Sequence, residues 1–214
     1  AVTSEVSTEG NLVTLLGDNA MKVTQLSVNG YLNNEDIGLL KKMAGQTKET
    51  DSEVTGSLKS LNLSEATFTE TGKIVPESIF QNCKNLQQVN LSNMTEIGKW
   101  AFNNCALTEI TIPASVTIIR EEAFKNCSAL TTLKFEAGTT SEKELVLKEE
   151  AFFGCGNMDL ADDGVLPSRI ISIANRTFQE CGITKLTLPQ NDKLTGVSRK
   201  LDFNGVQTDN MGAL

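Results

Sequence analysis

The most reactive side chains in the chain are five cysteines, and each of them ends the same four-residue pattern, Phe-x-x-Cys. Cysteine thiols can form disulfides, bind soft metals or act as nucleophiles. No two of these cysteines are close in sequence, so the paired spacing of a zinc site is missing. The pairs are Phe80 and Cys83, Phe102 and Cys105, Phe124 and Cys127, Phe152 and Cys155, and Phe178 and Cys181.

This recurrence indicates that the cysteines occupy one equivalent position in successive structural repeats. Neighbouring Cα atoms would then lie about 5 Å apart, which is within the range of a disulfide. Cysteine is also well suited to be a small, buried apolar residue. We therefore favour free, stacked thiols, with disulfides between repeats as the alternative. An odd number of cysteines is then no anomaly, because it follows the number of repeats.

Other residues that could carry chemistry form no recognisable site. Histidine is absent, which excludes His-dependent triads and His-containing zinc sites. The pairs Glu121-Glu122 and Glu149-Glu150 fall at the same repeat position and are most simply a solvated convex edge. Asp159, Asp162 and Asp163 lack the alternation and the terminal Glu of a calcium loop. We expect no catalysis, no cofactor and no bound metal.

The Phe-x-x-Cys pattern is part of a longer repeat. The spacings from cysteine to cysteine are 22, 22, 28 and 26 residues. After the cysteine comes Leu-x-x-Leu-x-Leu or a close variant, as in residues 86–91 and 130–135. Two earlier copies, residues 23–28 and 58–63, lack the Phe and Cys half. An aliphatic residue stands five residues before each phenylalanine: Val75, Ile97, Ile119, Leu147 and Ile173.

The repeat predicts a solenoid. In Leu-x-x-Leu-x-Leu the last two apolar positions alternate as on a β-strand, and such strands bury their apolar face only by stacking in parallel. Phe and Cys, at positions i and i+3, share one face of a short helical turn that would return the chain on the convex side. Asn82, Asn104, Asn126 and Gly154 precede a cysteine and tolerate a left-handed conformation. The phenylalanines and cysteines then form an internal ladder.

We divide the chain into four parts. Residues 1–10 are expected to be a flexible leader, and residues 11–73 an N-terminal cap with a helix and the first repeat-like strands. The repeats themselves fill residues 74–190. Residues 191–214 are a degenerate repeat or a C-terminal cap. A stacked core requires such caps at its ends.

The helix of the N-terminal cap is indicated by an apolar stripe at Ile37, Leu40 and Ala44. Asn33 or Asn34 can serve as its N-cap. Acidic residues follow in the first turn, and a glycine after two lysines marks the end of the helix.

The concave sheet should expose the residues that lie between the strand aliphatics. This surface is polar and lacks the Trp, Tyr or Arg anchors of a tight interface. Either it binds weakly and broadly, or it is only a solvated face. The candidate ligand-binding residues on it are Gln88, Asn90, Glu109, Thr111, Thr132, Lys134, Lys185 and Thr187.

Two aromatic residues interrupt the repeat and are further candidates for ligand binding. Trp100 stands where other repeats have Glu or Arg, and Phe153 stands where others have Asn, Lys or Gln. Both positions should be exposed, and exposed large apolar groups can mark contact sites. The simpler alternative is that Trp100 packs on neighbouring loops and Phe153 packs under the insertion of the 28-residue repeat.

Residues 97–135, IGKWAFNNCALTEITIPASVTIIREEAFKNCSALTTLKF, resemble the repeats of the BspA-like leucine-rich repeat family, and the resemblance covers roughly residues 74–190. Residues 23–45 resemble the region that precedes such repeats in surface proteins of anaerobic gut and oral bacteria. The resemblance implies a leucine-rich repeat solenoid, a right-handed β/α superhelix rich in strands. It also implies a secreted or lipid-anchored surface protein of a Gram-negative bacterium that adheres to host matrix proteins or to other bacteria. The family offers no shared catalytic residues.

The net charge of −8, from 19 basic and 27 acidic residues, disfavours nucleic acid and anionic membranes as partners. No stretch approaches the roughly 18 apolar residues that span a bilayer. We therefore expect a non-catalytic, extracellular or cell-surface protein, monomeric and with a lipid anchor upstream of the chain, that binds a protein or glycoprotein. The alternative is a structural spacer or stalk within a larger surface protein.

Overall fold

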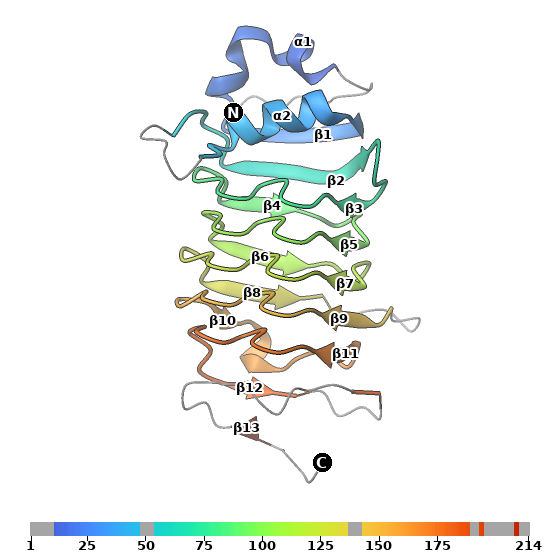
Figure 1. Ribbon diagram of the computed structural model, residues 1–214, viewed down its shortest axis with the longest axis vertical. Helices are drawn as coiled ribbons and strands as arrows, with labels where there is room; N and C mark the ends of the chain where they lie inside the picture. The colour runs from blue at the N-terminus through green and yellow to red at the C-terminus, as the bar shows by residue number, and fades with distance from the viewer. Residues whose placement is uncertain (1–10, 48–53, 137–142, 189–192, 195–207, 210–214) are drawn as a thin grey trace.

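The computed structural model describes residues 11–47, 54–136, 143–188 and 193–194, together with the backbone of residues 208–209. The chain winds into a stack of rungs, with the helices at its N-terminal end (Figure 1). Most rungs contribute one strand to a first face and a short strand to a second face. A turn that contains Phe-x-x-Cys then leads to the next rung. The expected leader and most of the expected C-terminal part lie outside the described residues.

Two helical segments precede the first strand, and one α-helix follows it. They are α1 (Leu12–Leu16), η1 (Gly17–Lys22) and α2 (Asn34–Met43), with β1 (Gln25–Leu32) between η1 and α2. Asn33 caps α2 by accepting hydrogen bonds from the N–H groups of Glu35 and Asp36. The fully buried carboxylate of Asp36 accepts from the N–H groups of Asn33 and Leu12, and so joins the beginnings of α1 and α2.

The first face consists of parallel strands in two hydrogen-bonded groups. β1, β2 (Ser60–Phe68) and β4 (Gln88–Asn90) form one group, whereas β6 (Glu109–Ile112), β8 (Thr132–Phe135) and β10 (Asp159–Leu160) form the other. β12 (Leu186–Thr187) follows and pairs in parallel with β13 (Thr208–Asp209). In β6 and β8 exposed and buried side chains alternate, which places Ile110 and Leu133 in the core.

The second face is a single parallel sheet of short strands. It contains β3 (Ile74–Val75), β5 (Glu96–Ile97), β7 (Ile118–Ile119), β9 (Leu145–Leu147) and β11 (Ile170–Ile173). The last residue of each of these strands is the aliphatic that stands five residues before a phenylalanine, and all five are fully buried. A short 3₁₀ turn, η2 (Asp162–Gly164), lies between β10 and β11.

The Phe-x-x-Cys segments are non-helical turns, whereas we expected short helical turns. In residues 100–105 every second N–H bonds to the carbonyl three residues earlier, and the N–H groups between them bond to the next rung. A helix would direct all of these groups along its own axis, so the links between rungs exclude it. The N–H groups that reach the next rung belong to Trp100, Phe102 and Asn104.

Left-handed residues lie at both ends of each turn. Asn82, Asn104 and Asn126 have φ of 61°, 56° and 60°, and Gly154 has φ of 74°, as their residue types predict. A second left-handed position, four residues earlier, has φ of 54–57° and was not indicated by residue type, because its occupants are Ser78, Trp100, Glu122, Glu150 and Arg176.

The phenylalanines of these turns form a continuous stack in the core. Successive ring centroids lie 5.0–5.6 Å apart, with planes between 1° and 23° from parallel. The five rings are at most 2% exposed. The five residues are Phe80, Phe102, Phe124, Phe152 and Phe178.

Candidate binding groove on the strand face

The structure places the predicted ligand-binding residues on the outward side of the first face. Thr187 is half-buried and the other seven strand residues are exposed. The register sets Glu109 beside Thr132 and Thr111 beside Lys134. Lys185 lies farther along the stack, where its ammonium group is 2.5 Å from the carboxylate of Asp163.

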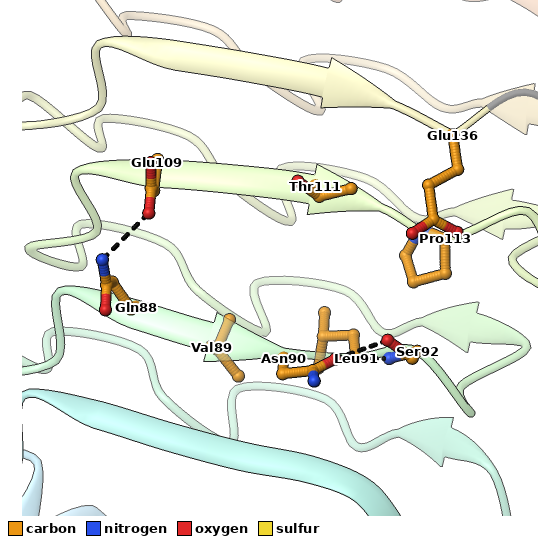
Figure 2. Close-up of a pocket in the computed structure, with 9 residues that line it drawn as sticks. All are labelled: Gln88, Val89, Asn90, Leu91, Ser92, Glu109, Thr111, Pro113 and Glu136. Carbon is orange, nitrogen blue, oxygen red and sulfur yellow. Dashed lines mark hydrogen bonds between the residues drawn. The ribbon is translucent and has the colours of Figure 1, made fainter. Parts of the chain in front are cut away.

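Four of these residues come together in one shallow groove between β4 and β6. The groove has a volume of about 260 Å³ and includes Gln88, Asn90, Glu109 and Thr111 (Figure 2). The side-chain amide of Gln88 donates to a carboxylate oxygen of Glu109 at 2.9 Å, which links the two strands across the groove. Thr132, Lys134, Lys185 and Thr187 are not among the residues that line it.

The groove lies where the first face divides into its two hydrogen-bonded groups of strands. β4 and β6 are neighbours along the stack, but they belong to different hydrogen-bonded groups. Val89, on β4, is only partly buried, whereas the residues at the corresponding positions of β2, β6 and β8 are at most 2% exposed. Those corresponding residues are Leu61, Ile110 and Leu133. Because β4 and β6 are not paired by strand hydrogen bonds, Val89 forms an apolar floor of the groove.

The groove is also lined by three residues that were not among the predicted binding residues: Ser92, Pro113 and Glu136. All three come after the end of a strand, where a strand-based pattern does not extend. The Glu136 carboxylate accepts a hydrogen bond from the N–H of Ala114 at 3.1 Å and so bends back over β6.

A buried arginine holds the wall of the groove from behind. Arg169 is 2% exposed, and its guanidinium donates to the carbonyl oxygens of Pro113 (3.0 Å), Val116 (2.8 Å) and Glu136 (3.2 Å). These carbonyls belong to two earlier rungs. Arg169 therefore joins three rungs at the place where the groove ends, and no sequence pattern singled it out.

The candidate aromatic residues are half-buried, so the expectation that they are exposed was wrong. The Lys99 ammonium group lies 4.1 Å from the ring centroid of Trp100. The Phe153 ring lies between the Lys125 ammonium group, at 5.2 Å, and the Arg176 guanidinium, at 4.5 Å. A lysine of the same rung thus covers Trp100, and cations of the two neighbouring rungs cover Phe153, so both rings are packed against charged side chains of this protein.

Those charged side chains form a network along the turns. Lys125 bonds to Glu150 (2.6 Å) and Glu122 (3.0 Å), and Arg176 pairs with Glu150. Burial raises the pKa of Glu122, but hydrogen bonds from Lys125 and Trp100 outweigh it and hold that pKa below its ordinary value. The pKa of Lys125 is raised, chiefly by its hydrogen bond to Glu150.

All five cysteines are free thiols. The Sγ atoms of Cys127, Cys155 and Cys181 each lie 3.1 Å from the carbonyl oxygen of a phenylalanine in the preceding rung. Burial raises the pKa of the Cys83 thiol to about 12. The pKa of Cys105 is also raised, mainly by burial. Such thiols carry little of the nucleophilic thiolate form at neutral pH.

Asp159, Asp162 and Asp163 do not form a metal cage in the described part of the chain. One oxygen of Asp159 accepts from the Thr184 hydroxyl at 2.7 Å and the other from the Thr184 N–H at 3.2 Å. Asp163 pairs with Lys185. Among the described residues, no group of three or more His, Cys, Asp or Glu side chains could hold a metal ion.

The repeat and its stacking agree with the comparison against protein families. The model of the BspA type leucine-rich repeat region matches in six copies, over residues 56–160 and 140–199. The chain belongs to the BspA-type leucine-rich repeat family. The match begins before residue 74, where the repeats were expected to start, and so includes β2. Among the helices that the structure describes, none is both long and apolar enough to cross a membrane.

Solved structures of two bacterial leucine-rich repeat proteins are similar to this BspA-type chain. One is a leucine-rich repeat protein of Bacteroides ovatus, with 19% identity and a TM-score of 0.38, over 66% of this chain and 49% of that protein. The other is a leucine rich cell surface protein of Faecalibacterium prausnitzii, with 16% identity and a TM-score of 0.32, over 78% and 67%. This chain thus spans about half of the Bacteroides protein. Comparison with curated proteins finds no match.

Proposed function

We propose that this BspA-type repeat protein is a non-catalytic binding protein that acts at the cell surface or outside the cell, and that its partner is a protein or glycoprotein. The observation that carries the proposal is the groove between β4 and β6. It gathers Gln88, Asn90, Glu109 and Thr111 around an apolar floor on an otherwise regular strand face. A rigid stack of parallel strands holds these side chains in a constant register, which suits recognition.

Two features of the groove support a macromolecular partner. Its volume of about 260 Å³ is below the roughly 300–1,000 Å³ of pockets that enclose a drug-sized molecule. It is also open along the strand face, so a partner's side chain can enter while the partner's backbone stays outside. Display at the surface through an upstream lipid anchor, in an adhesin-like role and as a monomer, is part of the same proposal.

Binding of the purified protein to immobilised host matrix proteins and to intact bacterial cells tests this function. The decisive comparison is between the groove variant N90A/T111A and the matched variant T132A/K134A, which removes two exposed side chains of β8 outside the groove. We expect the groove variant to bind at least about tenfold more weakly, the effect of about 1.4 kcal/mol, while the β8 variant keeps its affinity. Failure of the unmodified protein to bind any of these targets would leave it as a structural spacer.

A further inference from the structure

The groove has acceptors at both ends and an apolar middle. Glu109, on β6, and Glu136, after β8, supply two carboxylates at opposite ends, Pro113 lies beside Glu136, and Val89 of β4 supplies apolar surface (Figure 2). Each carboxylate accepts one hydrogen bond from the protein, from the Gln88 amide and from the Ala114 N–H respectively. A carboxylate has about four acceptor positions, so both retain capacity for a donor.

Neither carboxylate forms an ion pair with a cation in the described part of the chain. The ion pairs between described residues all lie elsewhere on the stack. Lys134, the cation closest in register, lies opposite Thr111 and forms no ion pair with Glu109 or Glu136. The Arg169 guanidinium is directed to backbone carbonyls behind the wall. The groove is therefore a negatively charged recess whose charge the described part of the chain does not neutralise.

From this geometry we infer that the groove binds the side chain of one arginine or lysine from a partner polypeptide. The inference rests on the proposed function and names the chemistry of its partner. The aliphatic stem of the basic residue packs on Val89, and its cationic head donates hydrogen bonds to Glu109, while Glu136 adds negative charge at the other end of the groove. The opening at the β4–β6 join admits the side chain, while the polar residues of the neighbouring rungs contact the partner's backbone.

The net charge of the chain also favours a basic partner. At −8, the protein attracts basic segments at a distance and repels acidic ones. Discrimination between partners then comes from the groove itself, because only a side chain with a long apolar stem and a cationic end satisfies both the Val89 floor and the Glu109 carboxylate.

A series of short synthetic peptides, added to the ¹⁵N-labelled protein and followed by NMR, tests the inference. The peptides are identical except for a central arginine, lysine, glutamine or glutamate. We expect the arginine and lysine peptides to shift the amide signals of β4, β6 and Ala114, and to bind at least about tenfold more tightly than the glutamine peptide, as the loss of one charge-assisted hydrogen bond predicts. Added salt should weaken the binding.

The variant E109Q/E136Q should lose this preference for the basic peptides, whereas E65Q, which alters an exposed carboxylate of β2 outside the groove, should keep it. Equal binding of the glutamine and arginine peptides would overturn the inference. So would stronger shifts of the same signals with a neutral oligosaccharide. The peptide series on the unmodified protein tests the preference for a basic side chain even if the double variant unfolds. Failure to bind matrix proteins or cells would count against the proposed function instead.

Discussion

The rings of Phe124 and Phe152 stack with their centroids 5.0 Å apart and their planes 1° from parallel, although the residues are 28 positions apart in the sequence. The neighbouring ring of Phe153 points outward, between two cations. Adjacent residues of the same type therefore have different roles: one joins two rungs in the core, and the other covers the turn.

Replacing Phe152 with alanine should destabilise the protein by about 3–5 kcal/mol, because the cavity removes a ring from the middle of the stack. Phe153→Ala is the matched control and should cost less than about 1.5 kcal/mol, since that ring is only half-buried. Urea unfolding measures both free energies. An equal loss of unfolding free energy in the two variants would contradict the conclusion that ring stacking is the main contribution of the Phe-x-x-Cys unit to stability.

Arg169→Met should cost about 2 kcal/mol or more, because the carbonyl oxygens of Val116 and Glu136 lose their donor and each unsatisfied acceptor costs about 1–3 kcal/mol, whereas the Pro113 oxygen keeps the N–H of Val116. Arg120→Met is the control: its side chain is 44% exposed and pairs with Glu96, so its loss should cost at most about 1 kcal/mol. Thermal and urea unfolding distinguish the two. Similar small effects would show that the wall of the groove is held by other contacts.

Glu122→Gln should lower stability at neutral pH by less than about 1 kcal/mol, and the difference should shrink in acid. The pKa of Glu122 is lowered in the folded state, so its contribution is present above the pKa of an unfolded glutamate, about 4.3, and is lost as the pH falls through the lower folded pKa. Unfolding free energies between pH 7 and pH 2 measure this. Glu121→Gln is the control, and a pH-independent effect at Glu122 would contradict the network.

The native protein should react slowly with a thiol-specific disulfide reagent at pH 8, and all five cysteines should react once it is unfolded. Burial raises the pKa of Cys83 to about 12, which leaves little thiolate. Cys181 is the least buried and should react first, although a hydrogen bond with Cys155 and burial raise its pKa too. Fast reaction of several thiols in the folded protein would contradict the burial of the cysteines. The variant Cys181→Ser shows whether the first thiol to react is that of Cys181.

Much of the stack could be predicted from the spacing of a few residue types. Parallel strands, the buried phenylalanines and the left-handed Asn82, Asn104 and Asn126 all follow from the repeat. The second left-handed position could not be predicted, because Trp100 or Glu122 has no preference for that conformation. It is adopted because the N–H groups of these residues bond to the next rung.

The candidate groove was predictable only in part. Gln88, Asn90, Glu109 and Thr111 were expected on one polar face, but the pattern could not separate them from Thr132 or Lys185, which lie outside the groove. Glu136 was missed, because its position depends on the hydrogen bond to Ala114 and on Arg169, 33 residues later.

The sequence by itself determined which side chains point inward and outward in each rung, because a repeat of constant spacing gives every copy the same environment. Only the tertiary structure decided where the regularity fails. The hydrogen-bonded groups separate between β4 and β6, and Arg169 reaches two earlier rungs. Both features depend on distances between rungs, which no single repeat encodes, and together they make the groove.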